Sequence, residues 1–168
     1  RARGGWFEVQ GQSMMPSYPP GMRVRASRLS YCFRSPRRGD VVAIHALLTD
    51  GRIDLKRIIA LPGEQLSWSQ GRFWVNGVLL DEPYARIPAA PPGDDDTRVL
   101  RLGPGEYFVA GDNRLYSRDS RTAGPLTRSS ILAKISTPQV LLRVAKQNQE
   151  PRACPGAFVV SRGSAPRV

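Results

Sequence analysis

Ser13 is a candidate nucleophile in this sequence. It stands within residues 10–17, between a glycine and a Met-Met-Pro turn. Glycine permits close backbone approach and proline stiffens the turn, so Ser13 could be held on a fixed loop with backbone N–H groups near its oxygen. Such a serine can attack a carbonyl, whereas a serine beside Gly and Pro is more commonly only part of a turn.

Lys56 is the candidate base, and lysine is scarce in this chain. Of the 25 basic residues, only Lys56, Lys134 and Lys146 are lysines, and the others are arginines, which do not act as bases near neutral pH. Residues 53–61 form an apolar run in which alternation puts Asp54 and Lys56 on one face. A lysine there either extends to solvent or is desolvated, and desolvation lowers its pKa from ~10.4 toward the range where the neutral amine is a base.

A polar segment at residues 111–121 crowds Asp, Asn, Arg and Ser side chains after a predicted strand. Such groups can hold neighbours in place through hydrogen bonds and ion pairs, although a polar loop explains this segment taken alone. The one histidine, His45, lies in a strand-like run and is interpreted as structural. One histidine and the distant Cys32 and Cys154 give no metal-ligand spacing, and no phosphate-binding glycine loop occurs, so no metal or cofactor is predicted.

Short β-strands are predicted to position these groups. The chain has 16 glycines and 15 prolines, which argues against a helical bundle. Asn76-Gly77, between two strand-like runs, predicts a tight hairpin because both residues readily take a positive φ. The predicted strands are alternating or β-branched runs bounded by turn residues, at 22–26, 41–45, 53–61, 66–68, 73–75, 78–80, 107–110 and 131–135.

The length of 168 residues suits one domain, which we expect to be mainly β with antiparallel sheets. The Pro-rich and then acidic residues 87–96 are expected to form a solvated loop or small insertion. Beyond residue 135 the apolar pattern thins. Residues 140–144 could form a short helix, and residues 141–168 are expected to be a flexible tail.

The formal net charge of +11 suits binding to phosphates or to anionic lipid head groups, and does not choose between them. We expect a membrane anchor to be absent from the chain as written, because it starts at Arg1 and no apolar run approaches the ~20 residues that cross a bilayer. Cys32 and Cys154 are compatible with one disulfide or with two free thiols.

Four segments in order resemble those of the type I signal peptidase family, which are membrane-anchored serine proteases with a Ser–Lys dyad. Any one segment is a modest signal, but four in order across most of the chain make chance an implausible explanation. The matching segments are Ser13-Met14-Met15-Pro16, Arg38-Gly39-Asp40-Val41-Val42, residues 56–64, and Gly111-Asp112-Asn113-Arg114 with Ser117, Asp119, Ser120 and Arg121.

The resemblance implies that Ser13 is the nucleophile and Lys56 the general base, with the Ser13 N–H as one oxyanion donor. Gly11 stands where many members carry a serine that adds a hydroxyl donor. Ser117 matches the serine thought to orient the lysine amine, and Arg57 would favour the neutral amine through like-charge repulsion. The residues that match those bracing the site through ion pairs are Arg57, Asp112, Asp119 and Arg121.

The resemblance also implies a partly open, barrel-like β fold, with residues 1–140 as the peptidase domain. Members of the family act on the extracytoplasmic side of a bacterial cytoplasmic membrane, where they release signal peptides by cutting after small residues in an A-x-A-like pattern. The implied partners are signal-peptide-bearing precursors and the membrane surface, with no specific nucleic acid. Trp6 and Phe7 either enter the bilayer surface or pack in an ordinary way.

Three alternatives stay open. A conjugative-transfer maturation protease shares the dyad and the pattern at residues 119–121 and 124–125, and departures from the common pattern at residues 17–18, 115–116 and 122–124 leave the subfamily open. A nucleic-acid-binding module would suit the charge, although the arginines are dispersed. A self-cleaving repressor shares the Ser–Lys chemistry, but no DNA-binding helix pair or Ala-Gly cleavage site precedes Ser13.

Overall fold

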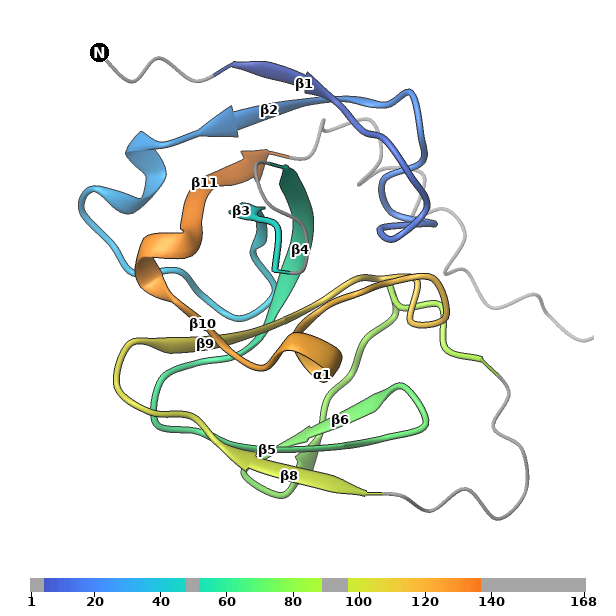
Figure 1. Cartoon of the computed structure of the whole chain (residues 1–168), viewed down its shortest axis with the longest axis vertical. Helices are drawn as coiled ribbons and strands as arrows, with labels where there is room; N and C mark the ends of the chain where they lie inside the picture. The colour runs from blue at the N-terminus through green and yellow to red at the C-terminus, as the bar shows by residue number, and fades with distance from the viewer. Residues whose placement is uncertain (1–4, 48–51, 89–96, 137–168) are drawn as a thin grey trace, which may run out of the picture. The chain divides into compact units, whose positions relative to one another are not determined.

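The computed structural model describes residues 5–47, 52–88 and 97–136, which form two antiparallel sheets (Figure 1). The larger sheet has seven strands in the order β1-β2-β11-β3-β4-β9-β10, and the smaller has four in the order β7-β6-β5-β8. The strands are β1 Trp6–Glu8, β2 Arg23–Ser27, β3 Val41–His45, β4 Ile53–Ala60, β5 Gln65–Ser69, β6 Arg72–Val75, β7 Val78–Leu79, β8 Arg98–Arg101, β9 Glu106–Ala110, β10 Leu126–Thr127 and β11 Ile131–Ser136.

The larger sheet has an apolar core on each of its faces, because alternate residues of β3 point to opposite sides. Val41 and Ala43 belong to a cluster that includes Met14 from the turn after β1. Val42 and Ile44 belong to a second cluster with residues of β9, β10 and β11. The turn that carries Ser13 is therefore fixed to the sheet through its neighbour Met14, whose exposed fraction is 1%.

The smaller sheet packs on the larger one through β9 and the end of β4. The ring of Phe108 lies 5.1 Å from that of Trp68 and 5.8 Å from that of Phe73, measured between centroids. The β6–β7 hairpin turns at Asn76 and Gly77, whose φ angles are 50° and 81°. The predicted hairpin is therefore confirmed, with the two positive φ angles that its sequence favours.

All eight predicted strands occur, with bounds shifted by at most two residues. The larger sheet curls and leaves β1 and β10 at its edges, so the predicted mainly β, partly open fold is confirmed (Figure 1). The sequence pattern missed three of the four edge strands, a short helix and two 3-10 turns, namely β1, β8, β10, α1 (Ser120–Ala123), η1 (Leu29–Tyr31) and η2 (Arg128–Ser130).

Some expectations fall outside the described residues. These are the solvated loop beyond residue 88, the short helix at 140–144, the tail at 141–168 and the cysteine at position 154. Cys32 is exposed. Within the ranges that the structure describes, no helix is long and apolar enough to span a bilayer.

Candidate active site

Ser13 and Lys56 meet although 43 residues separate them in sequence. The Lys56 Nζ lies 3.4 Å from the Ser13 Oγ, a loose hydrogen bond of the kind found in sites without substrate. Lys56 comes from the middle of β4, and its exposed fraction is only 3%. The pair thus combines a hydroxyl with a desolvated amine, which is the arrangement required for a nucleophile and its base.

Residues 111–114 contact the Ser13 turn through hydrogen bonds. The backbone N–H of Asn113 donates to the Ser13 carbonyl oxygen at 3.0 Å, and its side-chain amide donates to the Gln12 carbonyl oxygen at 3.1 Å. A Cβ at Gly111 would overlap that same Ser13 carbonyl oxygen and the Ser117 side chain. Glycine at position 111 therefore allows the closest approach between this segment and the serine turn.

The pKa of Lys56 is lowered from its ordinary value, and burial is the largest cause. The carboxylates of Asp54 and Asp119 oppose this effect and raise the pKa, whereas the charge of Arg121 lowers it. Asp54 lies closest, with its Oδ2 3.7 Å from Lys56 Nζ, and its side chain is 37% exposed. The effect of desolvation on the Lys56 pKa is larger than that of the two carboxylates. At a given pH, a larger fraction of Lys56 is therefore neutral than of an exposed lysine.

Arg57 forms the ion pair expected to brace the site, but it is not among the charges that act on the pKa of Lys56. Successive strand residues point to opposite faces, and Arg57 binds Asp112 through two hydrogen bonds of 2.8 and 2.6 Å. Its guanidinium also lies 3.8 Å from the centre of the Tyr84 ring. The like charge that lowers the pKa of Lys56 comes instead from Arg121. Arg57 thus connects β4 to the segment that supports Ser13.

Asp119 and Arg121 form the second ion pair at the site. The carboxylate of Asp119 is fully buried and binds the Arg121 guanidinium at 2.8 and 2.9 Å. It also accepts the backbone N–H of Gly111 at 3.0 Å and caps α1 through the Arg121 N–H. Burial alone would raise the pKa of Asp119, but the hydrogen bond and charge of Arg121 lower it, so the carboxylate stays ionised.

Ser117 and Gly11 are placed less directly. The Ser117 Oγ is buried against Gly111, where it helps to lower the pKa of Asp119, and no hydrogen bond to Lys56 is formed among the described residues. The orienting role that the resemblance implies for Ser117 stays a prediction. Gly11 is exposed with a φ of 78°, and nothing lies within 4 Å of where its Cβ would be. His45 is exposed at the end of β3 and makes no hydrogen bond to Ser13 among the described residues.

A buried ion pair behind the site had no signal in the sequence. Glu82 binds the Arg114 guanidinium at 2.7 and 3.0 Å, and both side chains are almost fully buried. Arg114 also donates to the carbonyl oxygens of Gly111 and Gly71 at 2.9 and 2.6 Å. Position 114 belongs to a recognised motif, but its partner lies in an irregular segment far away in sequence. The role of Glu82 as the partner of Arg114 could therefore be identified only from the three-dimensional structure.

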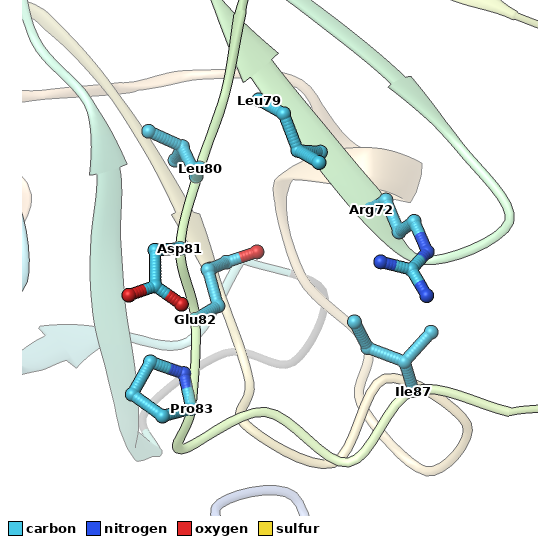
Figure 2. Close-up of a pocket in the computed structure, with 7 residues that line it drawn as sticks. All are labelled: Arg72, Leu79, Leu80, Asp81, Glu82, Pro83 and Ile87. Carbon is cyan, nitrogen blue, oxygen red and sulfur yellow. The ribbon is translucent and has the colours of Figure 1, made fainter.

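Two pockets among the described residues lie away from Ser13 and Lys56. Figure 2 shows a pocket of about 320 Å³ beside Glu82, between β6, β7 and the segment after them. Its lining consists of Arg72, Leu79, Leu80, Asp81, Glu82, Pro83 and Ile87. Among the residues with described positions, no group of His, Cys, Asp or Glu side chains could hold a metal ion.

Comparison with known proteins gives consistent results. Residues 4–140 match the family described as signal peptidase, peptidase S26. Signal peptidase I V of Bacillus subtilis is 32% identical over 140 residues, covering 77% of this chain and 82% of its relative. Signal peptidase I of Bacillus caldolyticus is 35% identical over 139 residues, covering 77% and 75%. A crystal structure of a signal peptidase I from Enterococcus faecalis is similar with a TM-score of 0.53 at 28% identity, covering 61% of this chain and 98% of that one.

Proposed function

Because the chain belongs to the signal peptidase family, peptidase S26, and is a serine peptidase that removes signal peptides, we propose that Ser13 and Lys56 form its catalytic dyad. The observation that supports this proposal is the 3.4 Å approach of a buried amine to the Ser13 hydroxyl. The lowered pKa of Lys56 agrees with a base that works without histidine.

In the proposed mechanism, the neutral Lys56 amine takes the proton of the Ser13 hydroxyl while Oγ attacks the scissile carbonyl carbon. The Ser13 N–H, which donates to no described residue, can stabilise the resulting oxyanion. The Lys56 ammonium then gives its proton to the leaving amine, and the C–N bond breaks to leave an acyl-enzyme. Lys56 next deprotonates a water that attacks the ester carbonyl, and protonated Ser13 is restored as the peptide leaves.

The substrate is proposed to lie in extended form along β4. Residues 53–57 pair with β3 on one side, while β9 pairs only from Arg57 onward. The other edge of residues 53–56 therefore has no strand partner among the described residues, and Lys56 stands at its end. An exposed edge can bind a peptide through backbone hydrogen bonds, with alternate side chains facing the site.

We expect the full chain to cut a precursor on the carboxyl side of an A-x-A-like sequence, since family members recognise small residues there. Incubation followed by mass spectrometry of both fragments measures the cleavage position. A matched precursor with Phe in place of the last Ala should be cut at least about tenfold more slowly, because a bulky side chain has to be accommodated beside the dyad. Equal cleavage of the two precursors would contradict the proposed specificity.

A second prediction concerns the pH dependence of the reaction. The Asp54 carboxylate raises the pKa of Lys56, so Asp54→Asn should lower that pKa further and move the acid limb of kcat/KM to lower pH. The remaining groups that act on Lys56 are Asp119 and Arg121, which the variant leaves intact. Asp81→Asn is the control, because this exposed carboxylate lines the pocket beside Glu82. An unchanged acid limb in Asp54→Asn would show that the ion pair does not act on the base.

The proposed location is the extracytoplasmic side of a bacterial cytoplasmic membrane, with the membrane surface as a partner. Two features support it. The chain carries a formal net charge of +11, which favours anionic lipid surfaces. Trp6 and Phe7 on the edge strand β1 are 63% and 45% exposed, and aromatic side chains of this kind favour the membrane interface. We assign the basic surface to lipid rather than to nucleic acid.

A further inference from the structure

A second exposed apolar feature lies in the loop between β2 and β3, residues 28–37, which we term the arginine loop. Phe33 is 97% exposed and Leu29 is 62% exposed. The side chains of Arg28, Arg34 and Arg37 are exposed around them, and the sequence contains no acidic residue from position 28 to position 39. Exposed apolar side chains whose charged neighbours in sequence are all cations form an unusual surface for a protein in water.

The arginine loop is held in place by hydrogen bonds. The side chain of Tyr31 is buried, and its hydroxyl donates to Asp40 at 2.9 Å. Asp40 in turn pairs with Lys134 of β11. Arg128 donates to the Tyr31 carbonyl oxygen at 3.4 Å and lies 5.2 Å from the centre of its ring. Phe33 therefore projects from an anchored loop, and Asp40, the first carboxylate after the loop in sequence, is already paired.

The arginine loop and the Ser13 turn lie at opposite ends of β2, so the loop does not cover the catalytic site. The loop follows the end of β2 that pairs with Trp6, whereas the Ser13 turn precedes the other end of β2 (Figure 1). Trp6, which is 63% exposed, is opposite Arg25 near the start of the arginine loop. A surface that contacts the loop and Trp6 can be engaged while a precursor reaches Ser13.

We propose that the arginine loop docks on anionic phospholipid, with Phe33 and Leu29 at the boundary of head groups and acyl chains and with Arg28, Arg34 and Arg37 on the phosphates. This inference rests on the proposed membrane location and gives it a specific contact. A guanidinium group can donate two parallel hydrogen bonds to the oxygens of one phosphate. Transfer of apolar side chains from water to the acyl-chain boundary has a favourable free energy. A nucleic acid offers phosphates but no apolar layer for Leu29, so the combination favours lipid.

The test is sedimentation of the full chain with vesicles of phosphatidylglycerol and phosphatidylcholine, against vesicles of phosphatidylcholine alone. We expect binding to the anionic vesicles only. Phe33→Ser should weaken the partition coefficient about tenfold, from the lost burial of one aromatic side chain. Replacing Arg28, Arg34 and Arg37 together by Gln should weaken it about a hundredfold, since each cation contributes about fivefold near an anionic surface.

Two controls separate the loop from general charge and hydrophobicity. Val99→Ser removes an apolar side chain that is 62% exposed on β8, and a triple Gln variant at Arg52, Arg72 and Arg101 removes the same charge elsewhere. Both should bind vesicles more tightly than their loop counterparts. Equal losses of vesicle binding in loop and control variants would overturn the proposal. It would also be overturned if the chain bound no vesicles but bound duplex DNA, and the loop variants lost that DNA binding. Cleavage of a soluble peptide should be unchanged in every loop variant. This assay measures catalysis without a membrane, so an error in the proposed dyad would be detected separately from an error in the proposed lipid contact.

Discussion

Ser13→Ala and Lys56→Ala should each reduce precursor cleavage by at least about 10³-fold, and the double variant should be no slower than either single variant. Both side chains serve the same step, because the amine removes the proton that the hydroxyl must lose as it attacks. Once either group is missing, the other has no reaction partner. Initial rates of precursor cleavage, measured with enzyme in excess, distinguish this shared step from additive effects.

The most informative variant at this pair is Lys56→Arg. Arginine keeps the positive charge and much of the length of the side chain, but it stays protonated at any pH where the protein is folded. If Lys56 acted only as a fixed cation, the variant would retain activity. If Lys56 accepts the proton of Ser13, the variant should be as inactive as Lys56→Ala. Retained cleavage in Lys56→Arg would therefore contradict general-base catalysis by this residue.

His45→Ala is the matched control for the choice of base. The histidine is exposed at the end of β3 and is not hydrogen-bonded to the nucleophile among the described residues. We expect the variant to keep most of the wild-type rate. Loss of cleavage in this variant alone would contradict the dyad and would indicate a histidine-dependent mechanism.

The sequence predicted the strands with a strong local pattern and missed those without one. β3 is buried over four of its five residues and β4 over four of its eight, and both are rich in Val or Ile, so their composition identifies them as strands. In β8, three of the four side chains are exposed and two are arginines, and only pairing with β5 makes the segment a strand. The missed strands β1, β8 and β10 are edge strands, whose ladder hydrogen bonds come from one neighbour alone.

The residues of the candidate site likewise fall into those that sequence motifs predict and those that only the fold brings together. Ser13 and Lys56 stand in motifs that the sequence displays, and their contact follows from the resemblance to a family. The position of Asp54 on the face of Lys56 followed from alternation, but its approach to 3.7 Å did not. Glu82 had no signal at all, because an ion pair with Arg114 depends on how a segment folds over the smaller sheet. Charge partners distant in sequence are the part of this site that only tertiary structure supplies.

The ion pair between Arg57 and Asp112 should be the main electrostatic support of the fold at the site. Asp112 is fully buried, and Arg57 next to Lys56 is 13% exposed. Among the described residues, Asp112→Ala leaves a desolvated guanidinium that keeps its hydrogen bond to the Gly39 carbonyl oxygen and its contact with the Tyr84 ring. We expect the free energy of unfolding in urea to fall by about 3 kcal/mol, at the lower end of the range for breaking a buried pair.

Activity should fall together with stability, since this pair joins β4 to the segment that holds the Ser13 turn. A displacement of about 1 Å between Ser13 and Lys56 is enough to reduce the rate about 10²-fold. Arg38→Gln is the control, because its pair with Glu64 is more exposed than the pair of Arg57 and Asp112, so the free energy of unfolding should fall by less. The double variant Arg57→Met/Asp112→Leu removes both charges and should be more stable than Asp112→Ala. If it is instead destabilised by the sum of the losses in Arg57→Met and Asp112→Leu, the two charges are not coupled, and the proposed electrostatic link between β4 and the segment that holds the serine turn is wrong.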